Sequence, residues 1–326
     1  MKKILALLLA LWIPAAVLSG CVPQDDSAAS NKLNIVTNIF PAYDWVREIL
    51  GAETDRAEIT TLLDSGVDLH SYQPTVDDIV KISNCDLFLY VGGESDGWVD
   101  DALKNAPNKD RKVIRLLDVL GDSAKAEETV EGMQEEEHDH EEEAEYDEHI
   151  WLSLKNAQVL VAAISEALQE TDPARKDTYA ANAAAYAEKL SALDGEYRAA
   201  VDSGKYKTLL FGDRFPFRYL ADDYGLDYYA AFPGCSAETE ASFETISFLA
   251  KKADELKLPC VLTIEGTQHK IAETVVQNTA QKNQQILTMD SMQAVTANDA
   301  ASGVSYLSIM EKNLSVLKKA LGQEAE

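Results

Sequence analysis

The chain has 326 residues, of which 56 are acidic and 29 basic, so its formal net charge is −27. This balance argues against a nucleic-acid-binding protein, which needs a basic footprint, and against charge-driven binding to anionic lipid. It is compatible with a protein that binds a cation.

The first residues follow a pattern typical of an exported lipoprotein. Lys2 and Lys3 precede an apolar run over residues 4–17, which is shorter than the roughly 20 apolar residues of a membrane-spanning helix. Leu18-Ser19-Gly20-Cys21 then matches a bacterial lipobox, in which the cysteine is lipidated and becomes the new N-terminus. The pattern predicts a signal peptide over residues 1–20 and lipidation at Cys21. A plain signal peptide with a chance cysteine is the alternative.

A short tether is predicted after the lipobox. Residues 22–32 are rich in Ser, Asp, Ala and Asn and show no apolar periodicity, so residues 21–32 are expected to form a lipidated tether. This places the protein on the extracytoplasmic face of the cell membrane, held by its lipid anchor. About 300 residues follow, which is large for one core and predicts two lobes.

Short apolar runs alternate with helical patterns along the rest of the chain. This alternation predicts parallel sheets built from strand–helix–strand units. Strands are predicted first at residues 33–39, 57–63, 87–91 and 112–117, and then at 206–211, 227–232, 260–265 and 285–289. Helices are predicted between them, among others at residues 43–50, 76–83, 242–256 and 271–279.

A long helical stretch separates the two sets of strands. Residues 153–170 predict one helix, and Asp172-Pro173 then gives a cap followed by proline at the first helical position. Residues 173–200 have high helix propensity and predict a linking helix. The expected fold is α/β, with lobes over 33–172 and 201–326 whose mostly parallel sheets are joined by one long rigid helix. No internal sequence repeat is visible, so any likeness between the lobes is expected in structure alone.

One strongly acidic segment interrupts the first lobe. Residues 127–148 contain thirteen Asp or Glu residues and no Lys or Arg, together with His138 and His140. Like charges this dense repel one another, which predicts a solvated loop. Histidine and carboxylate are also ligands of transition metals, so the favoured interpretation is an accessory loop that collects metal through His138 and His140.

Metal-ligand side chains follow several of the predicted strands, where ligands bind in open α/β sheets. A mixed set of histidines and carboxylates suits Zn²⁺, Mn²⁺ or Fe²⁺ better than Ca²⁺ or Mg²⁺. Each residue alone is weak evidence, because an aspartate at a strand end is often a helix cap and a single histidine is often structural. The residues concerned are His70, Asp213, Glu265 and Asp290, with His149 at the end of the acidic segment.

Three segments carry a family resemblance. Residues 66–75, GVDLHSYQPT, are similar to the pattern G-x-D-P-H-x-Y-x-P-T, and residues 147–152, DEHIWL, are similar to D-x-H-x-W-L. Residues 234–242, GCSAETEAS, resemble G-I-S-x-E-x-E-P-S. These motifs resemble those of the zinc- and manganese-binding solute-binding lipoproteins of bacterial ABC importers. The resemblance covers nearly the whole mature chain and implies two α/β lobes that hold a metal through His70, His149 and Asp290.

The chain departs from this family at the third ligand. Phe217, Tyr219 and the Tyr-Gly-Leu at residues 224–226 set a register that places Arg214 in the ligand position. Arginine has no lone pair to give a metal. Either three protein ligands and water complete the site or Asp213 replaces the missing ligand, with Glu265 as a less favoured choice. Arg214 is expected to turn toward a carboxylate such as Glu238 or Glu240.

Three cysteines remain besides Cys21, and an odd number cannot form a complete disulfide framework. Cys85 adjoins the apolar run at 87–91 and indicates a buried thiol. Pairing of Cys235 with Cys260 is left open.

The function implied by the resemblance is that of a metal receptor and not an enzyme. It would capture Zn²⁺, with Mn²⁺ as the alternative, and deliver it as a monomer to the permease of an ABC importer. A zinc enzyme with an open coordination position is a second hypothesis, but no H-E-x-x-H or activated Ser/His pattern supports it. An adhesin is a third hypothesis, for which the sequence gives no specific feature.

Overall fold

The computed structural model describes residues 32–104, 106–134, 145–236, 240–266 and 269–323. The predicted signal peptide, Cys21, most of the tether, and both His138 and His140 lie outside the described residues. Within them, no helix has both the length and the apolar character needed to cross a membrane.

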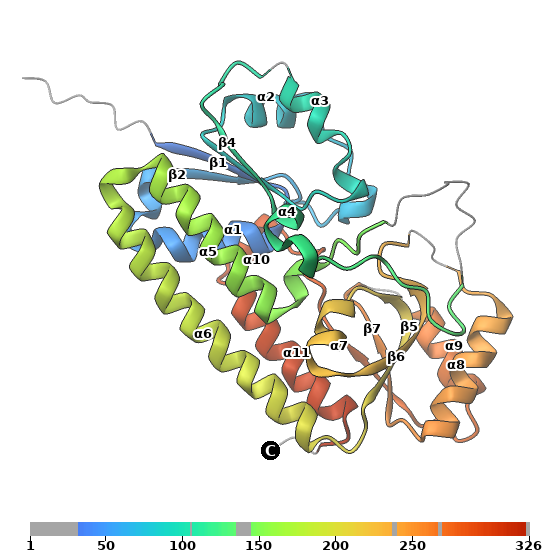
Figure 1. Cartoon of the computed structure of the whole chain (residues 1–326). Coiled ribbons are helices and arrows are strands. Elements are labelled where there is room, and N and C mark those ends of the chain that lie inside the picture. The colour runs from blue at the N-terminus through green and yellow to red at the C-terminus, as the bar shows by residue number, and fades with distance from the viewer. Residues whose placement is uncertain (1–31, 105, 135–144, 237–239, 267–268, 324–326) are drawn as a thin grey trace, which may run out of the picture. The chain divides into compact units, whose positions relative to one another are not determined.

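The first lobe is built on a sheet of four parallel strands (Figure 1). Helices cover both faces, because every residue of the central strand β3 is buried and such a strand needs apolar partners above and below the sheet. The strands are β1 (Leu33–Thr37), β2 (Ala57–Thr61), β3 (Leu87–Tyr90) and β4 (Lys112–Arg115), in the order β2-β1-β3-β4; the helices are α1 (Phe40–Leu50), α2 (Val76–Asn84), α3 (Val99–Lys104) and α4 (Leu116–Leu120).

The second lobe repeats this topology. Its four parallel strands follow the order β6-β5-β7-β8, which is the order of the first sheet displaced by four strands. The expected likeness between lobes is therefore present in structure, although the sequence shows no repeat. The strands are β5 (Thr208–Phe215), β6 (Asp227–Pro233), β7 (Cys260–Thr263) and β8 (Gln285–Thr288); the helices are α7 (Arg218–Tyr224), α8 (Phe243–Leu256), α9 (Lys270–Asn278), α10 (Ala297–Ala301) and α11 (Tyr306–Ala320).

Two long helices connect the sheets (Figure 1). α5 (Leu154–Thr171) leads into a 3-10 turn at Pro173–Arg175, and α6 (Lys176–Ser203) follows with 28 residues, a length of about 42 Å. Asp172 holds the turn, because its Oδ2 accepts hydrogen bonds from Arg175 Nη1 at 2.8 Å and from Tyr179 Oη at 2.9 Å. The predicted linking helix is confirmed, with its α-helical part starting three residues later. The exact limits of the two lobes remain a prediction.

All eight predicted strands are present, but the predicted end of β5 is wrong. The strand was expected to end at residue 211, whereas it continues to Phe215 through an irregularity between Phe211 and Arg214. Gly212 lies in this irregularity, and a Cβ there would stand 2.5 Å from the Cα of Ala272. Only glycine allows α9 to pack this closely on the strand. Asp213 and Arg214 consequently belong to the strand and do not follow its end.

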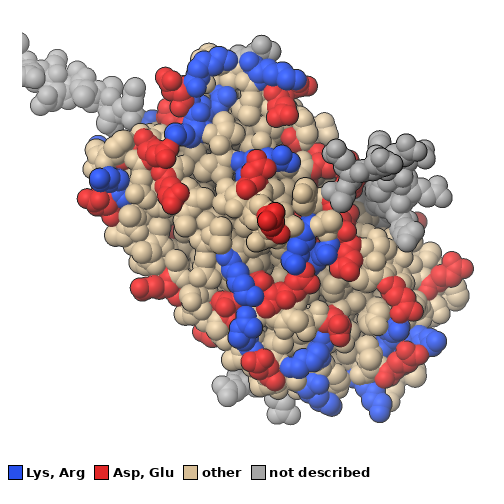
Figure 2. All heavy atoms as spheres, in the orientation of Figure 1, with Lys and Arg blue, Asp and Glu red and all other residues tan. Residues whose placement is uncertain are grey.

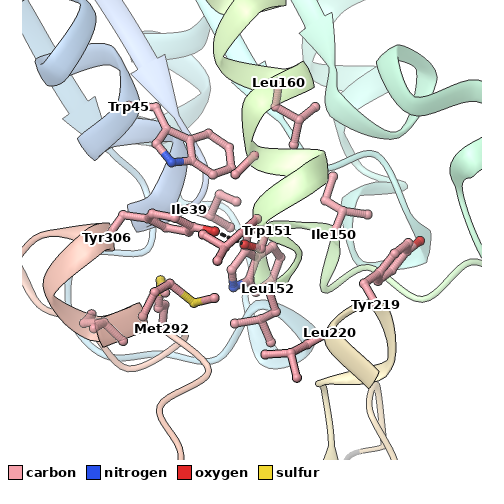
Figure 3. Close-up of a cluster of buried hydrophobic side chains, with 14 of the residues drawn as sticks. Ile39, Trp45, Ile150, Trp151, Leu152, Leu160, Tyr219, Leu220, Met292 and Tyr306 are labelled. Carbon is pink, nitrogen blue, oxygen red and sulfur yellow. Dashed lines mark hydrogen bonds between the residues drawn. The ribbon is translucent and has the colours of Figure 1, made fainter. Parts of the chain in front are cut away.

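A buried aromatic cluster lies where segments of both halves meet (Figure 3). Trp151 donates a hydrogen bond from Nε1 to the carbonyl of Ser291 at 2.8 Å, and its own carbonyl accepts one from Tyr306 Oη at 2.7 Å. The ring of Tyr306 packs edge-on against Trp45 of α1, with centroids 5.2 Å apart. We name Trp45, Trp151 and Tyr306 the aromatic wall. It fixes the chain immediately after His149.

Candidate metal site

His70 is held by the loop that follows β2. Asp68 caps a 3-10 turn over Leu69–Ser71 by accepting a hydrogen bond from the backbone N–H of His70 at 3.0 Å. The Nδ1 atom of His70 lies 3.2 Å from Glu148 Oε2 and 3.0 Å from Ser95 Oγ. A carboxylate this close to Nδ1 favours the tautomer with the proton on that nitrogen, in which Nε2 carries the lone pair.

His149 is arranged in the same way but is fully buried. Asp147 accepts two hydrogen bonds at Oδ1, one from the backbone N–H of His149 at 2.9 Å and one from its Nδ1 at 3.0 Å. The carbonyl of Asp147 accepts a further bond from Tyr219 Oη at 3.0 Å. The imidazole is thus oriented by its own chain neighbour, which is in turn tied to α7.

The two imidazoles point their Nε2 atoms at each other at 3.2 Å. Neutral imidazoles with protonated Nδ1 atoms present two lone pairs here and cannot hydrogen-bond to one another. A metal cation resolves this conflict. Two nitrogens at zinc–imidazole bond lengths of roughly 2.05 Å stand about 3.3 Å apart in tetrahedral coordination. The observed separation therefore suits a shared tetrahedral ion, and the structure brings together the two histidines predicted from the sequence.

Cys235 is the third potential ligand beside them. One ligand atom each from His70, His149 and Cys235 lies within 4.8 Å of the other two, and among the described residues these three form the group able to hold a metal ion. Sequence analysis missed this residue and considered it only as a disulfide partner. The signal was available, because Cys235 follows β6 at the same sheet edge as the other candidates. Cys85, Cys235 and Cys260 are all free thiols, so the open pairing of Cys235 with Cys260 is absent from the structure.

Gln293 approaches the same point from the second lobe. Its Nε2 lies 3.3 Å from His149 Nε2, while its buried Oε1 has no hydrogen-bond partner among the described residues. Glu265 positions this segment: its carboxylate accepts bonds from the backbone N–H and the hydroxyl of Ser291, each at 2.6 Å, and from the backbone N–H of Gln293 at 3.1 Å. Glu265 thus supports the loop that presents Gln293.

The two carboxylates assigned from the sequence lie outside this group. Asp213 accepts backbone hydrogen bonds from Arg214 at 2.9 Å and Ile264 at 3.3 Å, and burial raises its pKa. Asp290 accepts one from Met292 at 2.8 Å. Burial and the neighbouring Glu265 carboxylate raise the pKa of Asp290 to about 6. The assignment of Asp213 and Asp290 as ligands remains a prediction.

Arg214 pairs with a carboxylate, as expected, and the partner seen among the described residues is Asp68. Its Nη2 donates to Asp68 Oδ2 at 2.5 Å and its Nη1 donates to the carbonyl of Ser236 at 3.1 Å. Burial alone would raise the pKa of Asp68, but the guanidinium outweighs it and holds the pKa below its usual range. Asp68, in the facing loop of the first lobe, is thus the carboxylate partner among the described residues, and it was not named in the sequence analysis. Glu238 itself lies outside the described residues.

A cavity of about 410 Å³ opens beside the site, lined by His70 and Cys235 and by several acidic side chains. The two ends of the acidic segment meet at this cavity. The backbone N–H of Glu127 donates to the carbonyl of Glu145 at 2.7 Å, and Ala126 forms an antiparallel bridge with Tyr146. The acidic lining residues are Glu94, Glu127, Glu145 and Glu148. Negative charge therefore surrounds the opening nearest to the two histidines, which favours entry of a cation.

The face of the molecule drawn in Figure 2 is less one-sided in charge than the net charge suggests. On the face drawn in Figure 2, basic and acidic side chains are interspersed and no broad basic area is visible.

The model of the family described as "Zinc-uptake complex component A periplasmic" matches residues 35–320. The chain belongs to this family, whose description names a component of an uptake complex and not an enzyme. The resemblance found in the sequence is thereby confirmed.

Relatives and solved structures agree with this placement. The zinc-binding lipoprotein AdcA of Streptococcus pneumoniae is 33% identical over 99% of this chain and 62% of its own length, so the chain spans about three fifths of that relative. The zinc uptake protein ZnuA of Bacillus subtilis is 29% identical over 89% of this chain and 88% of its own. The Zn(II)-bound ZnuA-like domain of the S. pneumoniae AdcA has a TM-score of 0.69 at 30% identity, covering 90% of this chain and all of that domain.

The first prediction concerns Asp147, which orients His149. Asp147→Asn removes the negative charge that favours the proton on Nδ1, so metal affinity should fall roughly 10- to 100-fold, as it does when partners of metal-bound histidines are lost. Competition with a chromophoric chelator measures the change. Asp101→Asn is the matched control, because Asp101 pairs with Lys104 on the exposed face of α3. Equal affinities of the two variants would contradict the assigned role of Asp147.

Proposed function

We propose that the protein is an extracytoplasmic receptor that captures a divalent transition metal between its two lobes and delivers it to an ABC importer. Zn²⁺ is the metal that we propose. The observation that carries the proposal is the pair of imidazole Nε2 atoms, 3.2 Å apart, each in a ring whose Nδ1 lies 3.0 to 3.2 Å from a carboxylate oxygen. Family membership and the zinc-binding relatives support it. Asp290 and Asp213 complete the ligand set proposed from the sequence.

The positions of His70 and His149 indicate the order in which the ion would be captured and released. His70 stands on a loop of the first lobe beside the acidic cavity, so it is the ligand first met by an entering ion. His149 is fully buried, with its ring centroid 5.4 Å from that of Trp151 in the aromatic wall, and it defines the inner end of the site. An ion held by both nitrogens is removed from water, and its release needs the separation of His70 from His149. The importer would supply that separation by moving the lobes.

Imidazole nitrogen favours Zn²⁺ over the harder ions Mg²⁺ and Ca²⁺. Mn²⁺ is the second candidate, and carboxylate ligation by Asp213 and Asp290 would favour it. The metal is cargo in this scheme, and no chemical step is assigned to it. A zinc enzyme and an adhesin are not favoured by any contact in the described residues.

The anchor and the oligomeric state are part of the proposal. The lipobox at residues 18–21 supports lipid attachment at Cys21, and the S. pneumoniae relative is named a lipoprotein. The receptor would therefore act as a monomer tethered at the outer face of the cell membrane, where the importer permease is its partner.

The second prediction tests the two histidines directly. His70→Ala and His149→Ala each remove a ligand nitrogen and should weaken zinc binding by more than roughly 100-fold, beyond the loss expected for an outer partner. Chelator competition measures the affinity. Zinc binds the native state alone, so it should raise the melting temperature of the wild type but of neither variant, and a chelator should reverse the rise.

His269→Ala is the matched control for this experiment, because His269 is the remaining histidine of the described chain and lies outside the ligand group. It should bind zinc as the wild type does. Unchanged affinity in His70→Ala or His149→Ala would refute the site.

The third prediction separates the acidic segment from the tight site. Met133 is buried in the core and the backbone N–H of Gln134 donates to the carbonyl of Ala231 at 2.9 Å, so only residues 135–144 are exchanged for a Gly/Ser linker of equal length. One tightly bound zinc per chain should remain and the additional weak sites should disappear, as calorimetry would show.

His138→Asn with His140→Asn keeps the acidic charge of this segment and tests the imidazoles separately. This double variant should keep the tightly bound zinc and lose only part of the zinc binding at the weak sites. Loss of the tight zinc in the linker variant would mean that the segment belongs to the main site.

The fourth prediction concerns the anchor. Cys21→Ala removes the thiol that accepts lipid, so the protein should leave the detergent phase in a phase-partitioning assay and lack acyl mass in its mass spectrum. Cys85→Ala, at a buried thiol of the first lobe, should partition as the wild type does. Retention of Cys21→Ala in the detergent phase would contradict lipidation at this residue.

A further inference from the structure

We propose that Cys235 binds the metal through its sulfur as a thiolate and is the third protein ligand, in the place that Arg214 cannot fill. The inference rests on the proposed function, because it needs a metal at His70 and His149. It changes the expected chemistry of the site from two nitrogens and carboxylate oxygens to two nitrogens and one sulfur.

The first observation is the position of Cys235 just beyond the end of β6. Gly234 precedes it, and a Cβ at Gly234 would stand 3.1 Å from His149 Nδ1 and 2.9 Å from the carbonyl of Phe215. The missing side chain lets the backbone approach the imidazole closely. The cysteine sulfur comes within 4.8 Å of a ligand nitrogen on each histidine.

That separation is close to a coordination distance. With zinc–sulfur and zinc–nitrogen bonds of about 2.3 and 2.05 Å, a sulfur and a nitrogen on one tetrahedral ion stand about 3.6 Å apart. The upper bound of 4.8 Å exceeds this by about 1.2 Å, a change within reach of a rotation about the Cα–Cβ bond of Cys235.

The second observation is that the backbone on both sides of the sulfur is held in place. The backbone N–H of Cys235 donates to Glu127 Oε1 at 2.9 Å. The carbonyl of the next residue, Ser236, accepts from Arg214 Nη1 at 3.1 Å, and Arg214 is itself held by Asp68 at 2.5 Å. Arg214 thus acts as a positioning residue for the cysteine segment, and its positive charge is directed to Asp68.

The third observation is independent of the cysteine and points to a cation. Gln293 is only 9% exposed and its Oε1 has no hydrogen-bond partner among the described residues, while its Nε2 lies 3.3 Å from His149 Nε2. An unpartnered buried carbonyl is costly. Rotation of the amide brings Oε1 to the side of His149, where a cation held by the three ligands would satisfy it.

The binding step balances without a redox partner. The thiol of Cys235 loses its proton, the sulfur lone pair forms the bond to the dication, and the proton leaves to water through the adjoining cavity. A thiolate is a soft ligand that selects Zn²⁺ over Mn²⁺. The proposal therefore also chooses between the two metals that the sequence left open.

The experiment uses the full-length chain with Cys21→Ala, so that Cys21 offers no thiolate, loaded with one equivalent of Co²⁺ or Zn²⁺. Co²⁺ bound to a thiolate shows a sulfur-to-metal charge-transfer band in the near ultraviolet. This band should be present in the parent protein and in Cys260→Ala, the matched control at a buried thiol, and absent in Cys235→Ser. The ratio of the affinity for Zn²⁺ to the affinity for Mn²⁺ should fall by more than roughly tenfold in Cys235→Ser.

X-ray absorption at the zinc edge of the parent protein gives a test that needs no variant. One sulfur neighbour at about 2.3 Å is expected. One tightly bound zinc with a shell of nitrogen and oxygen alone would overturn the thiolate ligand and leave the proposed function intact. A parent protein that binds neither Co²⁺ nor Zn²⁺ would overturn both.

Discussion

The site depends on one electrostatic conflict: two imidazole lone pairs directed at each other across 3.2 Å. Asp147 accepts a hydrogen bond from Nδ1 of His149, and the Glu148 carboxylate lies 3.2 Å from Nδ1 of His70, so both carboxylates favour a proton on the Nδ1 side. Both carboxylates are buried. Burial of a charged group is unfavourable unless an opposite charge compensates it, either in direct contact or through a histidine bound to a cation. A divalent ion between the two Nε2 atoms would relieve the lone-pair repulsion and balance the carboxylates, so that histidines, carboxylates and metal would form one electrostatic unit.

Such a unit needs rigid surroundings, because small displacements change a coordination distance. The aromatic wall provides rigid surroundings on the inner side. Trp151 accepts a hydrogen bond from Tyr306 (Figure 3) and donates one to the carbonyl of Ser291. Tyr219 provides them on the outer side: its hydroxyl accepts from the backbone of Lys125 at 2.9 Å and donates to the carbonyl of Asp147 at 3.0 Å. Both ends of the acidic segment are fixed in this way. The length of the segment between them therefore does not loosen His149.

Much of this arrangement was predictable from the sequence, for identifiable reasons. The strands are short apolar runs between helical patterns, and the two histidine motifs are distinctive. The end of β5 was not predictable, because Gly212 within a strand and Gly212 after a strand give the same local pattern. The carboxylate partner of Arg214 was missed because Asp68 is 146 residues away in the chain. The place of Cys235 just after β6 was visible in the sequence, but its closeness to His149 was not, because only the packing of the lobes brings the end of β6 to that histidine.

Arg214 shows how a cation can occupy a ligand position without destroying a metal site. At about 4 Å and an effective dielectric constant of 20, two like unit charges repel by on the order of 4 kcal/mol, and a divalent ion doubles this. The guanidinium avoids that cost by forming a charge-assisted bond with Asp68, which lies in the same loop as His70. The same pair joins a loop of the first lobe to a strand of the second. The Arg214–Asp68 ion pair at the edge of the site therefore makes a contact between the two lobes of this chain. A metal–ligand bond from position 214 would otherwise make that contact.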